Sequence, residues 1–493
     1  MSINIIRKDI VFQPDSSRVI ARFLFSSEER CKQLIQLILS LSEQEQKQEL
    51  SNVFRKYAKR HRNILRIFDR HFERLHPVLN SMGIEHKALG TTERMLIGAY
   101  FTMEYSIEAA AFFNPSIVED PDQSRLGFGE RRVILSFRAT GEGHISSIVF
   151  RSAIIDGNDL ITVESPGRML DSPEHVRKHV YNKSSFLAKL GEMQNLDNAA
   201  YPVIEMKLTE TFTYEELRRY VDETKWSISV DEPSQVFLRE TMWLASSHYE
   251  MDFSLNTDIS ERVIFPIADT EQRGIEDARF VKFTQDDEDT VYYATYTAYD
   301  GTSILPKILK TKDFYHFKVL PIHGEIAQNK GMAFFSRKIN GKYAMLCRID
   351  GVNNYIAFSD NINVWREATM IQSPKFPWEF VQIGNCGSPL ETEAGWLVLT
   401  HGVGPMREYV LGASLFELDN PQNEIGRLSE PLLIPNQKER EGYVPNVVYS
   451  CGALIHNESL VIPYAMSDYA STYAVVKLKE LLKALIPNDR TLV

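Results

Sequence analysis

The sequence has few cysteines, no long hydrophobic run and none of the common cofactor-binding motifs. Its four cysteines, Cys31, Cys347, Cys386 and Cys451, are far apart and form neither a CxxC pair nor a metal-ligand spacing. We therefore expect buried, reduced thiols and no metal site. The chain has no glycine-rich loop of the Walker or dinucleotide type, so we also expect no cofactor.

The sequence also argues against membrane and nucleic-acid partners. No apolar run approaches about 18 residues, the length of a membrane-spanning helix. The N-terminus lacks a basic segment followed by an apolar one, which a secretory signal would have. We expect a cytoplasmic protein. The net charge of −11 argues against nucleic acid or an anionic membrane as the main partner.

The composition is typical of a large globular protein. Among 493 residues, 43% are hydrophobic, 25% are charged and 11% are aromatic. This length predicts more than one domain. The aromatic residues would suit the stacking of sugars, although protein cores also use them.

Residues 27–112 have the pattern of amphipathic helices. Leu34, Ile35 and Ile38 recur near a spacing of 3.6 residues among Glu, Gln and Lys, and similar patterns follow over 53–79 and 92–112. We expect residues 1–112 to form a mostly helical N-terminal extension. It would cap the rest of the protein or contribute to a homo-oligomer.

Beyond residue 115 the pattern changes to short apolar strands separated by Gly, Asp and Asn. The same plan, a strand, a polar turn and a second strand, recurs with first strands at 132–138, 290–296, 342–348, 395–401 and 459–464. The last four begin about 52, 53 and 64 residues apart, a period typical of propeller blades.

We therefore predict a mainly β fold, a five-bladed β-propeller over 113–485. The long gap after the first repeat predicts an insertion in the first blade region, at about 166–258, with a helical pattern over 214–225. Five unrelated hairpins in a sandwich are the alternative.

The stretch Gly-Ile-Glu-Asp-Ala-Arg-Phe at 274–280 is the most informative site candidate. A carboxylate pair, Glu276 and Asp277, precedes a strand-like run, and Arg279 lies beside it. Such carboxylates can exchange a proton, and a guanidinium can keep one of them ionised. A turn with a salt bridge is the structural alternative. Several first strands also end in polar residues, which in a propeller would surround a central funnel.

Eight segments, taken in chain order, resemble one enzyme family. They are Asn-Pro-Ser-Ile at 114–117, Ser-Phe-Arg-Ala at 136–139, Gly-Ile-Glu-Asp-Ala-Arg at 274–279, Arg-Lys-Ile-Asn-Gly-Lys-Tyr at 337–343, Gly-Ser-Pro-Leu-Glu-Thr-Glu-Ala-Gly-Trp-Leu at 387–397, His-Gly-Val at 401–403, Glu-Gly-Tyr-Val-Pro-Asn-Val-Val at 441–448 and Tyr-Ala-Met-Ser-Asp at 464–468. Together they resemble glycoside hydrolase family 130, five-bladed propeller enzymes that act on β-mannosides. The resemblance spans about 114–480, and residues 14–20 resemble the long-form β-1,2-mannosidase members.

The resemblance implies an inverting mechanism with Asp277 as general acid, acting through a hydroxyl of the bound mannose. Ala278 replaces the proline usual in the family. Phosphorylases of the family carry a lysine where this chain has Glu391. A carboxylate there would repel phosphate and could activate water. We therefore expect a hydrolase that releases mannose from β-1,2-linked mannosides, with Glu391 and either Glu439 or Glu441 activating water.

The substrate contacts implied by the resemblance form a larger set. They are Asn114, Arg138, Glu276, Arg279, Tyr296, Lys330, Arg348, His401, Asn446 and Asp468. Structural alternatives are core packing for Tyr296, a structural histidine for His401 and a turn cap for Asp468. Two other functions stay open: a β-mannoside phosphorylase that forms α-mannose 1-phosphate, with Lys330, Arg348 and His401 as its cationic pocket, and a non-catalytic glycan-binding propeller. In each case the partner is a β-mannoside oligosaccharide.

Overall fold

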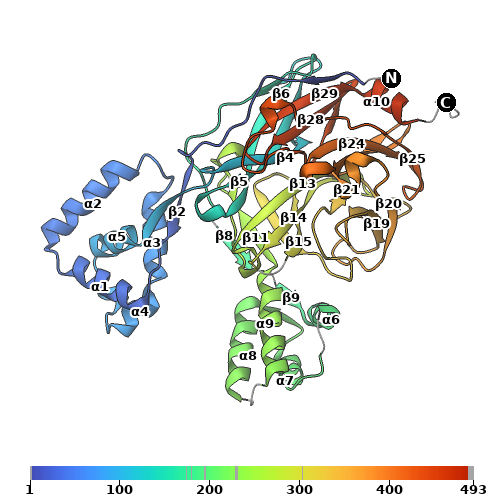
Figure 1. The fold of residues 1–493 in the computed structure, drawn as a ribbon. Helices are drawn as coiled ribbons and strands as arrows, with labels where there is room; N and C mark the ends of the chain where they lie inside the picture. Colours follow the sequence, from blue (N-terminus) through green and yellow to red (C-terminus); the bar gives the residue numbers. More distant parts are fainter. Residues whose placement is uncertain are drawn as a thin grey trace.

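The computed structural model describes residues 3–173, 175–178, 180–193, 196–227, 231–301 and 304–486. Within these ranges the chain is mainly β. Figure 1 shows a β-rich body with two helical lobes, one of residues 28–100 in blue and one of residues 183–246 in green. None of the described helices is long and apolar enough to cross a membrane.

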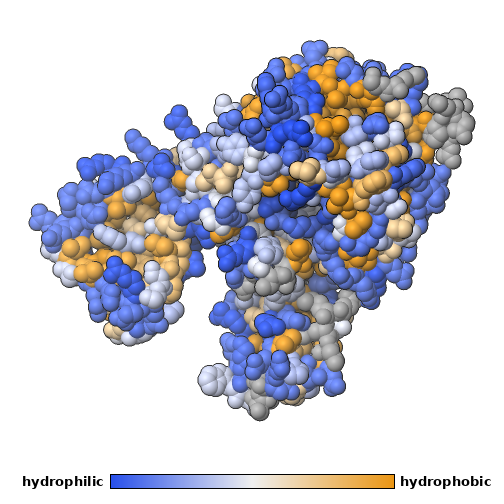
Figure 2. All heavy atoms as spheres, viewed as in Figure 1, coloured by the Kyte–Doolittle hydropathy of each residue, from blue (hydrophilic) through white to orange (hydrophobic). Residues whose placement is uncertain are grey.

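Capped amphipathic helices build the N-terminal lobe. They are α1 (Glu28–Leu39), α2 (Glu43–Tyr57), α3 (Ile64–Glu73), α4 (His76–Ser81) and α5 (Thr91–Tyr100). The side chains of Ser27 and Ser42 accept backbone N–H groups at the starts of α1 and α2, which satisfies donors that have no partner within the helix. Ile35, Phe72 and Leu96 meet in one core, as the apolar spacing predicts. Figure 2 shows further hydrophobic atoms in the middle of this lobe, inside a hydrophilic rim.

The predicted helical extension is wrong at both ends. The helix predicted over 92–112 is α5, which stops at Tyr100. After it, β3 (Thr102–Ser106) pairs antiparallel with β2 (Val19–Phe23). This pairing satisfies backbone groups that a longer helix would have paired within itself. At the start of the chain, β1 (Ile5–Arg7) pairs with β29 (Ala470–Lys477). The first residues of the predicted extension therefore belong to the last sheet.

Five antiparallel units follow in chain order, and each contains one of the predicted hairpins. The first has β4 (Ala111–Glu119), β5 (Arg131–Thr140), β6 (Ser146–Ile155) and β7 (Ile161–Val163). The second has β13 (Gly274–Thr284), β14 (Thr290–Tyr299), β15 (Ile304–Thr311) and β16 (His316–Pro321). The third has β17 (Ala333–Phe334), β18 (Tyr343–Cys347), β19 (Asn354–Ser359) and β20 (Ala368–Gln372). The fourth has β21 (Gln382–Asn385), β22 (Leu390–Thr392), β23 (Gly395–Val403), β24 (Tyr409–Phe416) and β25 (Glu424–Arg427). The fifth has β26 (Val448–Tyr449), β27 (Leu454–His456), β28 (Ser459–Met466), β29 and β1, and α10 (Leu478–Leu485) follows it.

The first two units are joined through β6. Both β12 (Val263–Ile264) and Gly274 of β13 pair with β6, and the resulting sheet has eleven strands. The other three units are separate sheets. The start of β13, where the Glu-Asp-Ala-Arg motif lies, is therefore tied to the first unit.

The second helical lobe lies within the predicted insertion. Its elements are β8 (His175–Lys178), β9 (Val180–Asn182), α6 (Lys183–Met193), α7 (Ala200–Lys207), β10 (Thr211–Thr213), α8 (Tyr214–Ser227), α9 (Glu232–Ser246) and β11 (Tyr249–Asp252). The helix expected over 214–225 is α8. Because β11 pairs with both β8 and β16, this lobe extends the edge of the second unit, although it follows the first in sequence. Residues 174, 179, 194–195 and 228–230 of the insertion lie outside the described residues.

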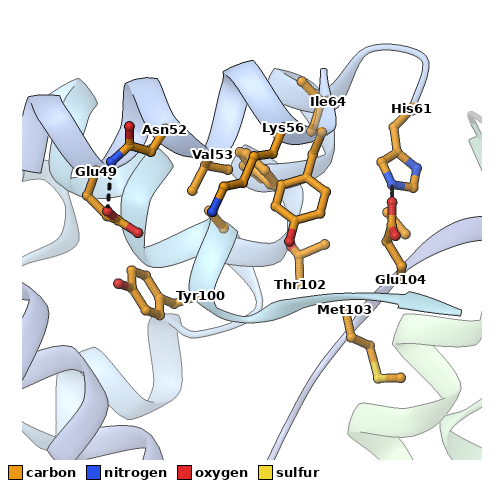
Figure 3. Close-up of a pocket in the computed structure, with 14 residues that line it drawn as sticks. Glu49, Asn52, Val53, Lys56, His61, Ile64, Tyr100, Thr102, Met103 and Glu104 are labelled. Carbon is orange, nitrogen blue, oxygen red and sulfur yellow. Dashed lines mark hydrogen bonds and ion pairs between the residues drawn. The ribbon is translucent and has the colours of Figure 1, made fainter. Parts of the chain in front are cut away.

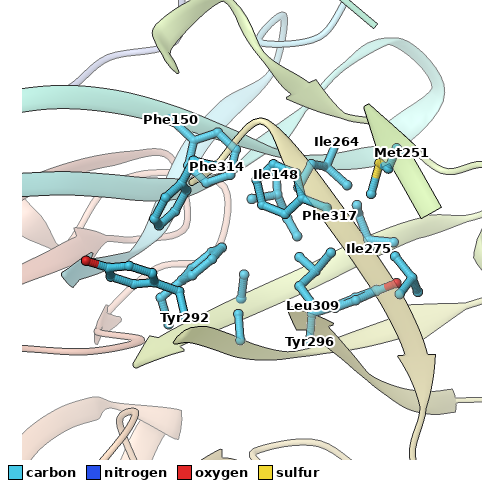
Figure 4. Packing of buried hydrophobic residues seen from close by; sticks show 14 of the residues in the cluster. Ile148, Phe150, Met251, Ile264, Ile275, Tyr292, Tyr296, Leu309, Phe314 and Phe317 are labelled. Atoms are coloured by element: carbon cyan, nitrogen blue, oxygen red, sulfur yellow. The ribbon is translucent and has the colours of Figure 1, made fainter. Parts of the chain in front are cut away.

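An aromatic core supports the second unit (Figure 4). The ring of Phe150 lies 6.0 Å from that of Phe314 and 6.2 Å from that of Phe317, between ring centroids. Ile275 and Tyr296 belong to the same buried cluster. Burying a side chain of this size contributes roughly 1.5–3 kcal/mol. Because Ile275 of β13 packs in this core, the core holds β13 in position.

Candidate active site

Two β-bulges face each other across β4 and β13. In each strand an irregularity shifts the pairing register, and each places a non-glycine residue in the left-handed region, Asn114 with φ 49° and Asp277 with φ 56°. Asn114 Nδ2 donates a hydrogen bond to Asp277 Oδ1 at 2.7 Å. Left-handed backbone at such residues costs about 1–3 kcal/mol and is typical of functional sites.

Arg138 binds both carboxylates of the Glu-Asp-Ala-Arg motif. Its Nη2 donates to Glu276 Oε1 at 2.7 Å, and its Nη1 lies 3.5 Å from Asp277 Oδ1. Its Nε donates to Ser146 Oγ at 3.0 Å, which orients the guanidinium. Lys330 Nζ pairs with the other oxygen of Glu276. Strands of two units and the loop before the third therefore converge on Glu276 and Asp277.

Arg279 extends the cationic group toward the fourth and fifth units. It is buried, donates to the side-chain and backbone oxygens of Asn385, and reaches the Tyr449 hydroxyl at 2.6 Å. Asn385 and Tyr449 were not predicted as site residues. Their signal in the sequence is a polar group beside motif segments that were recognised, Asn385 just before 387–397 and Tyr449 just after 441–448.

A neutral histidine lies beside this group. Arg348 Nη1 lies 3.2 Å from His401 Nε2. Since the guanidinium only donates, Nε2 accepts and Nδ1 carries the proton, toward Cys386 Sγ at 3.7 Å. Burial, followed by the charges of Arg348 and Arg279, holds the pKa of His401 well below its ordinary value. The imidazole is therefore uncharged at neutral pH.

The electrostatics of Asp277 favour its ionised form. Burial raises the pKa of Asp277, but the charge of Arg138, the hydrogen bond from Asn114 and the charges of Lys330 and Arg279 together hold it below its ordinary value of 3.8. A general acid must be protonated. Something that offsets the surrounding cations is needed before Asp277 can act in that role.

Asp468 lies within the field of the same group. Burial and then the charge of Asp277 raise the pKa of Asp468 to about 6, against the opposing charge of Arg138. Its backbone is left-handed, with φ 52°. A strained, half-buried carboxylate close enough to sense Asp277 and Arg138 fits the predicted contact to sugar hydroxyls better than a plain turn cap.

The structure pairs Glu391, which was expected to activate water, with an arginine outside the cluster around Asp277. Arg337 holds Glu391 in a two-pronged ion pair, with Nη2–Oε1 at 2.7 Å and Nε–Oε2 at 2.9 Å. The side chains are 39% and 41% exposed. Glu391 pairs with Trp396 at one end of β23, and His401 lies five residues further along the strand, roughly 16 Å away at about 3.3 Å per residue. The charge of Glu391 is compensated outside the site.

Glu439 and Glu441, the other glutamates expected to activate water, are not joined to Asp277 by the contacts of the described residues. Glu439 is buried and accepts hydrogen bonds from Arg7 Nε at 3.1 Å and from the Tyr464 hydroxyl at 2.6 Å. Its carboxylate joins the N-terminal strand to the fifth unit. Glu441 is exposed on the loop that follows. No hydrogen bond or ion pair between described residues links either glutamate to Asp277.

Two predicted substrate contacts have other partners. Tyr296 is 2% exposed and donates its hydroxyl to Glu271 Oε1 at 2.8 Å, which favours its alternative, core packing. Asn446 is half-buried, and its side-chain oxygen accepts from Arg440 Nε at 2.8 Å. Periodicity could not distinguish Tyr296 from a funnel residue because both faces of β14 are buried.

Comparisons with known proteins agree with the motif resemblance. The family model for glycoside hydrolase family 130, described as beta-1,4-mannooligosaccharide phosphorylase, matches residues 251–486. A 1,2-beta-oligomannan phosphorylase from Thermoanaerobacter sp. is 34% identical over 222 residues, which cover 43% of this chain and 72% of that protein. A beta-1,2-mannobiose phosphorylase from the same organism is 34% identical over 224 residues, covering 43% of this chain and 68% of that protein.

Among solved structures, the beta-1,2-mannobiose phosphorylase from Listeria innocua in complex with beta-1,2-mannobiose is 22% identical, with a TM-score of 0.46, over 77% of this chain and 93% of that chain. The family match contains Asp277, Lys330, Arg348 and His401, whereas Asn114 and other first-unit residues of the site precede it. The sequence identity and coverage of the two Thermoanaerobacter relatives decide the assignment. This chain belongs to glycoside hydrolase family 130.

Proposed function

We propose that this protein is an inverting β-mannoside phosphorylase that cleaves β-1,2-linked oligomannosides with inorganic phosphate. The observation that carries the proposal is the distribution of charges at the site. Arg138, Lys330 and Arg279 act on Asp277, and Arg348 lies beside His401, which also senses the charge of Arg279, whereas Glu391 is paired elsewhere. Cationic side chains suit phosphate as the attacking group. The printed names of the two Thermoanaerobacter relatives support the β-1,2 linkage and phosphorolysis.

The reaction balances with the groups available. A phosphate oxygen attacks C1 of the mannose from the face opposite the glycosidic oxygen, and the bond from C1 to that oxygen breaks. Asp277 supplies the proton for the leaving oxygen, through a mannose hydroxyl. Monohydrogen phosphate loses its hydrogen when the ester forms, and this proton restores Asp277. The products are α-mannose 1-phosphate and a shortened oligosaccharide.

Phosphate binding also explains how Asp277 becomes an acid. The cations beside Asp277 hold its pKa low. A phosphate dianion among Arg279, Lys330 and Arg348 offsets those charges and raises the pKa of Asp277. Binding of the phosphate nucleophile thus raises the pKa of Asp277, and Asp277 becomes protonated in the complex that reacts.

Hydrolysis is the second candidate, and Asp468 is the observation in its favour. With a pKa of about 6, Asp468 is ionised at neutral pH and senses the charge of Asp277. A carboxylate in that state can activate water in an inverting hydrolase. This alternative replaces Glu391 by Asp468 as the base, and it requires turnover that is independent of phosphate.

We further propose that the five β units form the blades of a propeller, with the N-terminal lobe of residues 28–100 and the insertion of about 166–258 attached to it. The sequential order of the units, their antiparallel pairing and the pairing of β1 with β29 support this arrangement. Strand ends from different blades would then converge on Asp277. The hydrogen bond between Asn114 and Asp277 is consistent with such convergence.

The decisive experiment is incubation with β-1,2-mannobiose, with and without inorganic phosphate, followed by NMR identification of the products. Phosphorolysis gives α-mannose 1-phosphate only when phosphate is present. Free mannose released at a phosphate-independent rate would establish the hydrolase instead. Asp277→Asn should abolish either reaction.

A matched pair of arginine variants tests the phosphate site. Arg348→Gln should raise the KM for phosphate by at least about 10-fold, because it removes a charge beside His401. Arg337→Gln removes an equal charge from the pair with Glu391 and should leave the KM for phosphate unchanged. Equal effects of the two variants would contradict the proposed location of the phosphate.

A further inference from the structure

The N-terminal lobe contains a cavity that the proposed reaction does not use. It lies between α2, α3, α5 and β3 and has a volume of about 450 Å³. Ile64 and Phe68 are buried beneath it, and Tyr57 and Tyr100, each 39% exposed, line it from α2 and α5. Volumes of this size are typical of small-ligand sites. An apolar base with two accessible aromatic rings suits a ligand that has an apolar face.

Polar side chains surround the same cavity (Figure 3). Figure 3 shows the Lys56 ammonium reaching over the cavity, near Glu49 and Asn52 of the same helix. Asn52 Nδ2 lies 3.3 Å from Glu49 Oε2. Among the described residues, Lys56 makes no hydrogen bond or ion pair. These side chains can therefore hydrogen-bond to the hydroxyl groups of a ligand. The carboxylate of Glu49 accepts, the ammonium of Lys56 donates, and the amide of Asn52 can do both.

A second hollow continues the cavity along α2. It has a volume of about 670 Å³ and shares Glu49 and Tyr100 with the first. Its lining includes Ser42, Gln44 and Gln48, which are hydroxyl and amide side chains. The two hollows together form an elongated cleft along α2, with Glu49 and Tyr100 lining both parts. An elongated cleft suits a linear ligand longer than a single sugar.

The charges of the cleft favour a neutral ligand. Glu49 and Lys56 have opposite signs, and Glu45 already accepts hydrogen bonds from the backbone N–H and hydroxyl of Ser42. Glu104, at the far side, is bound by Arg60 in a two-pronged pair and by His61. A strongly anionic ligand would meet Glu49, and a purely apolar one would leave the polar groups buried without partners. Aromatic rings beside mixed polar side chains match a neutral polyhydroxyl chain.

We propose that the cleft formed by Glu49, Asn52, Lys56, Tyr57 and Tyr100 is an ancillary oligosaccharide-binding site. Its ligand is a neutral β-mannoside oligosaccharide of the kind the catalytic site takes, and this identity rests on the proposed function. Binding at the cleft keeps long substrates near the catalytic site and raises their effective concentration there. Mannobiose fills only part of the elongated cleft and is held there weakly, so its turnover gains nothing from the cleft.

The binding test uses the full chain with Asp277→Asn, which prevents turnover. Calorimetric titration with β-1,2-mannotetraose should give two equivalents per chain. The added substitutions Tyr57→Ala and Tyr100→Ala should remove one of them. Trp226→Ala, at a 91% exposed aromatic residue of α8, is the matched control and should leave both equivalents. One equivalent in all these proteins would overturn the proposal.

Kinetics on the active protein separate the cleft from the catalytic site. The double variant Tyr57→Ala, Tyr100→Ala should raise the KM for mannotetraose at least about 5-fold and leave the KM for mannobiose unchanged. Equal effects on both substrates would overturn the ancillary site. So would a protein that is dimeric and becomes monomeric on these substitutions, because the cleft would then be a subunit interface.

The two proposals fail differently. If mannobiose is turned over but mannotetraose binds with one equivalent, the cleft is wrong and the function stands. If no mannoside is turned over and the tetraose still binds in a manner that depends on Tyr57 and Tyr100, the function is wrong and the sugar-binding cleft stands.

Discussion

Asn114 and Asp277 are 163 residues apart in sequence, and their side chains meet at 2.7 Å. Both residues have left-handed backbone, and both lie where the pairing register of a strand shifts. Each bulge turns a side chain out of the regular alternation of its strand. The pair therefore brings a residue of the first unit to the candidate acid of the second.

Replacing Asn114 with Ala should change the pH dependence of turnover. The variant loses a hydrogen bond to the ionised form of Asp277, so the pKa of Asp277 rises. Because the acid must be protonated, kcat/KM should begin to fall at a higher pH than in the wild type. Lost orientation of Asp277 should lower the maximal kcat by roughly 10-fold. The measurement is kcat/KM against pH at fixed phosphate.

Asn340→Ala is the control for this prediction. Asn340 has the same φ of 49° on a hairpin of the third unit, so its replacement imposes similar backbone strain away from Asp277. It should lower the melting temperature without moving the pH profile. An unshifted profile for Asn114→Ala would show that Asn114 does not tune Asp277.

Asp468→Asn should stabilise the protein at neutral pH while reducing activity. The folded-state pKa of Asp468 is about 6, above its ordinary value of 3.8. Its contribution to stability is therefore complete below about pH 4 and is lost as the pH rises through 6. The variant avoids the buried charge, so at pH 7.5 its free energy of unfolding should exceed that of the wild type by about 1–3 kcal/mol. The difference in melting temperature should shrink at pH 5.

Asp350→Asn should behave in the opposite direction. Although burial opposes it, hydrogen bonds from the backbone and side chain of Asn353 hold the pKa of Asp350 at about 2. The stability that Asp350 contributes is present above about pH 4 and is lost only as the pH falls toward 2. This variant should be less stable than the wild type at pH 7.5. If both aspartate variants shift stability in the same direction, the assigned environments are wrong.

Lys307→Met should strongly destabilise the fold. Lys307 and Glu271 are fully buried and pair at 2.7 Å, and Tyr249 and Tyr296 donate to the same carboxylate. Removal of the cation leaves Glu271 buried without its counter-charge, which costs about 3–5 kcal/mol. Denaturant unfolding should show a much lower midpoint. The double variant Lys307→Met, Glu271→Gln should recover much of the loss, and an equally unstable double variant would contradict a charge effect.

Glu391→Gln should leave kcat within about 2-fold of the wild type. Its partner Arg337 is 39% exposed, and exposed ion pairs contribute about 0–1 kcal/mol. Steady-state kinetics on β-1,2-mannobiose with phosphate provide the measurement. A loss of two orders of magnitude would return Glu391 to the catalytic role expected from sequence.

The sequence predicted the elements more reliably than their ends. The apolar spacing of α1 and α2 and the five hairpins were recognisable because each depends on residues close in sequence. The end of α5 and the pairing of β1 with β29 were not, since β2 and β29 lie far from their partners in the chain. Local periodicity contains no information about such pairing.

The candidate site was predictable as a set of residue types and less so as a constellation. The motif 274–279 identified Glu276, Asp277 and Arg279, and the resemblance added Asn114 and Arg138, which the structure brings together. The charge of Glu391 suggested a base because a carboxylate replaces a lysine there. Its partner Arg337, which neutralises that charge outside the site, is visible only in the structure.

The sequence by itself determined the family, the predominance of β hairpins and the carboxylates and cations available for chemistry, because these depend on residue identity and short-range spacing. The tertiary structure decided which charges share one site. It placed Arg138, Lys330 and Arg279 near Asp277, Arg348 beside His401, and Glu439 in a pair with Arg7. The physical reason is that electrostatic interaction depends on distance and burial in space, and strand pairing sets both over hundreds of residues.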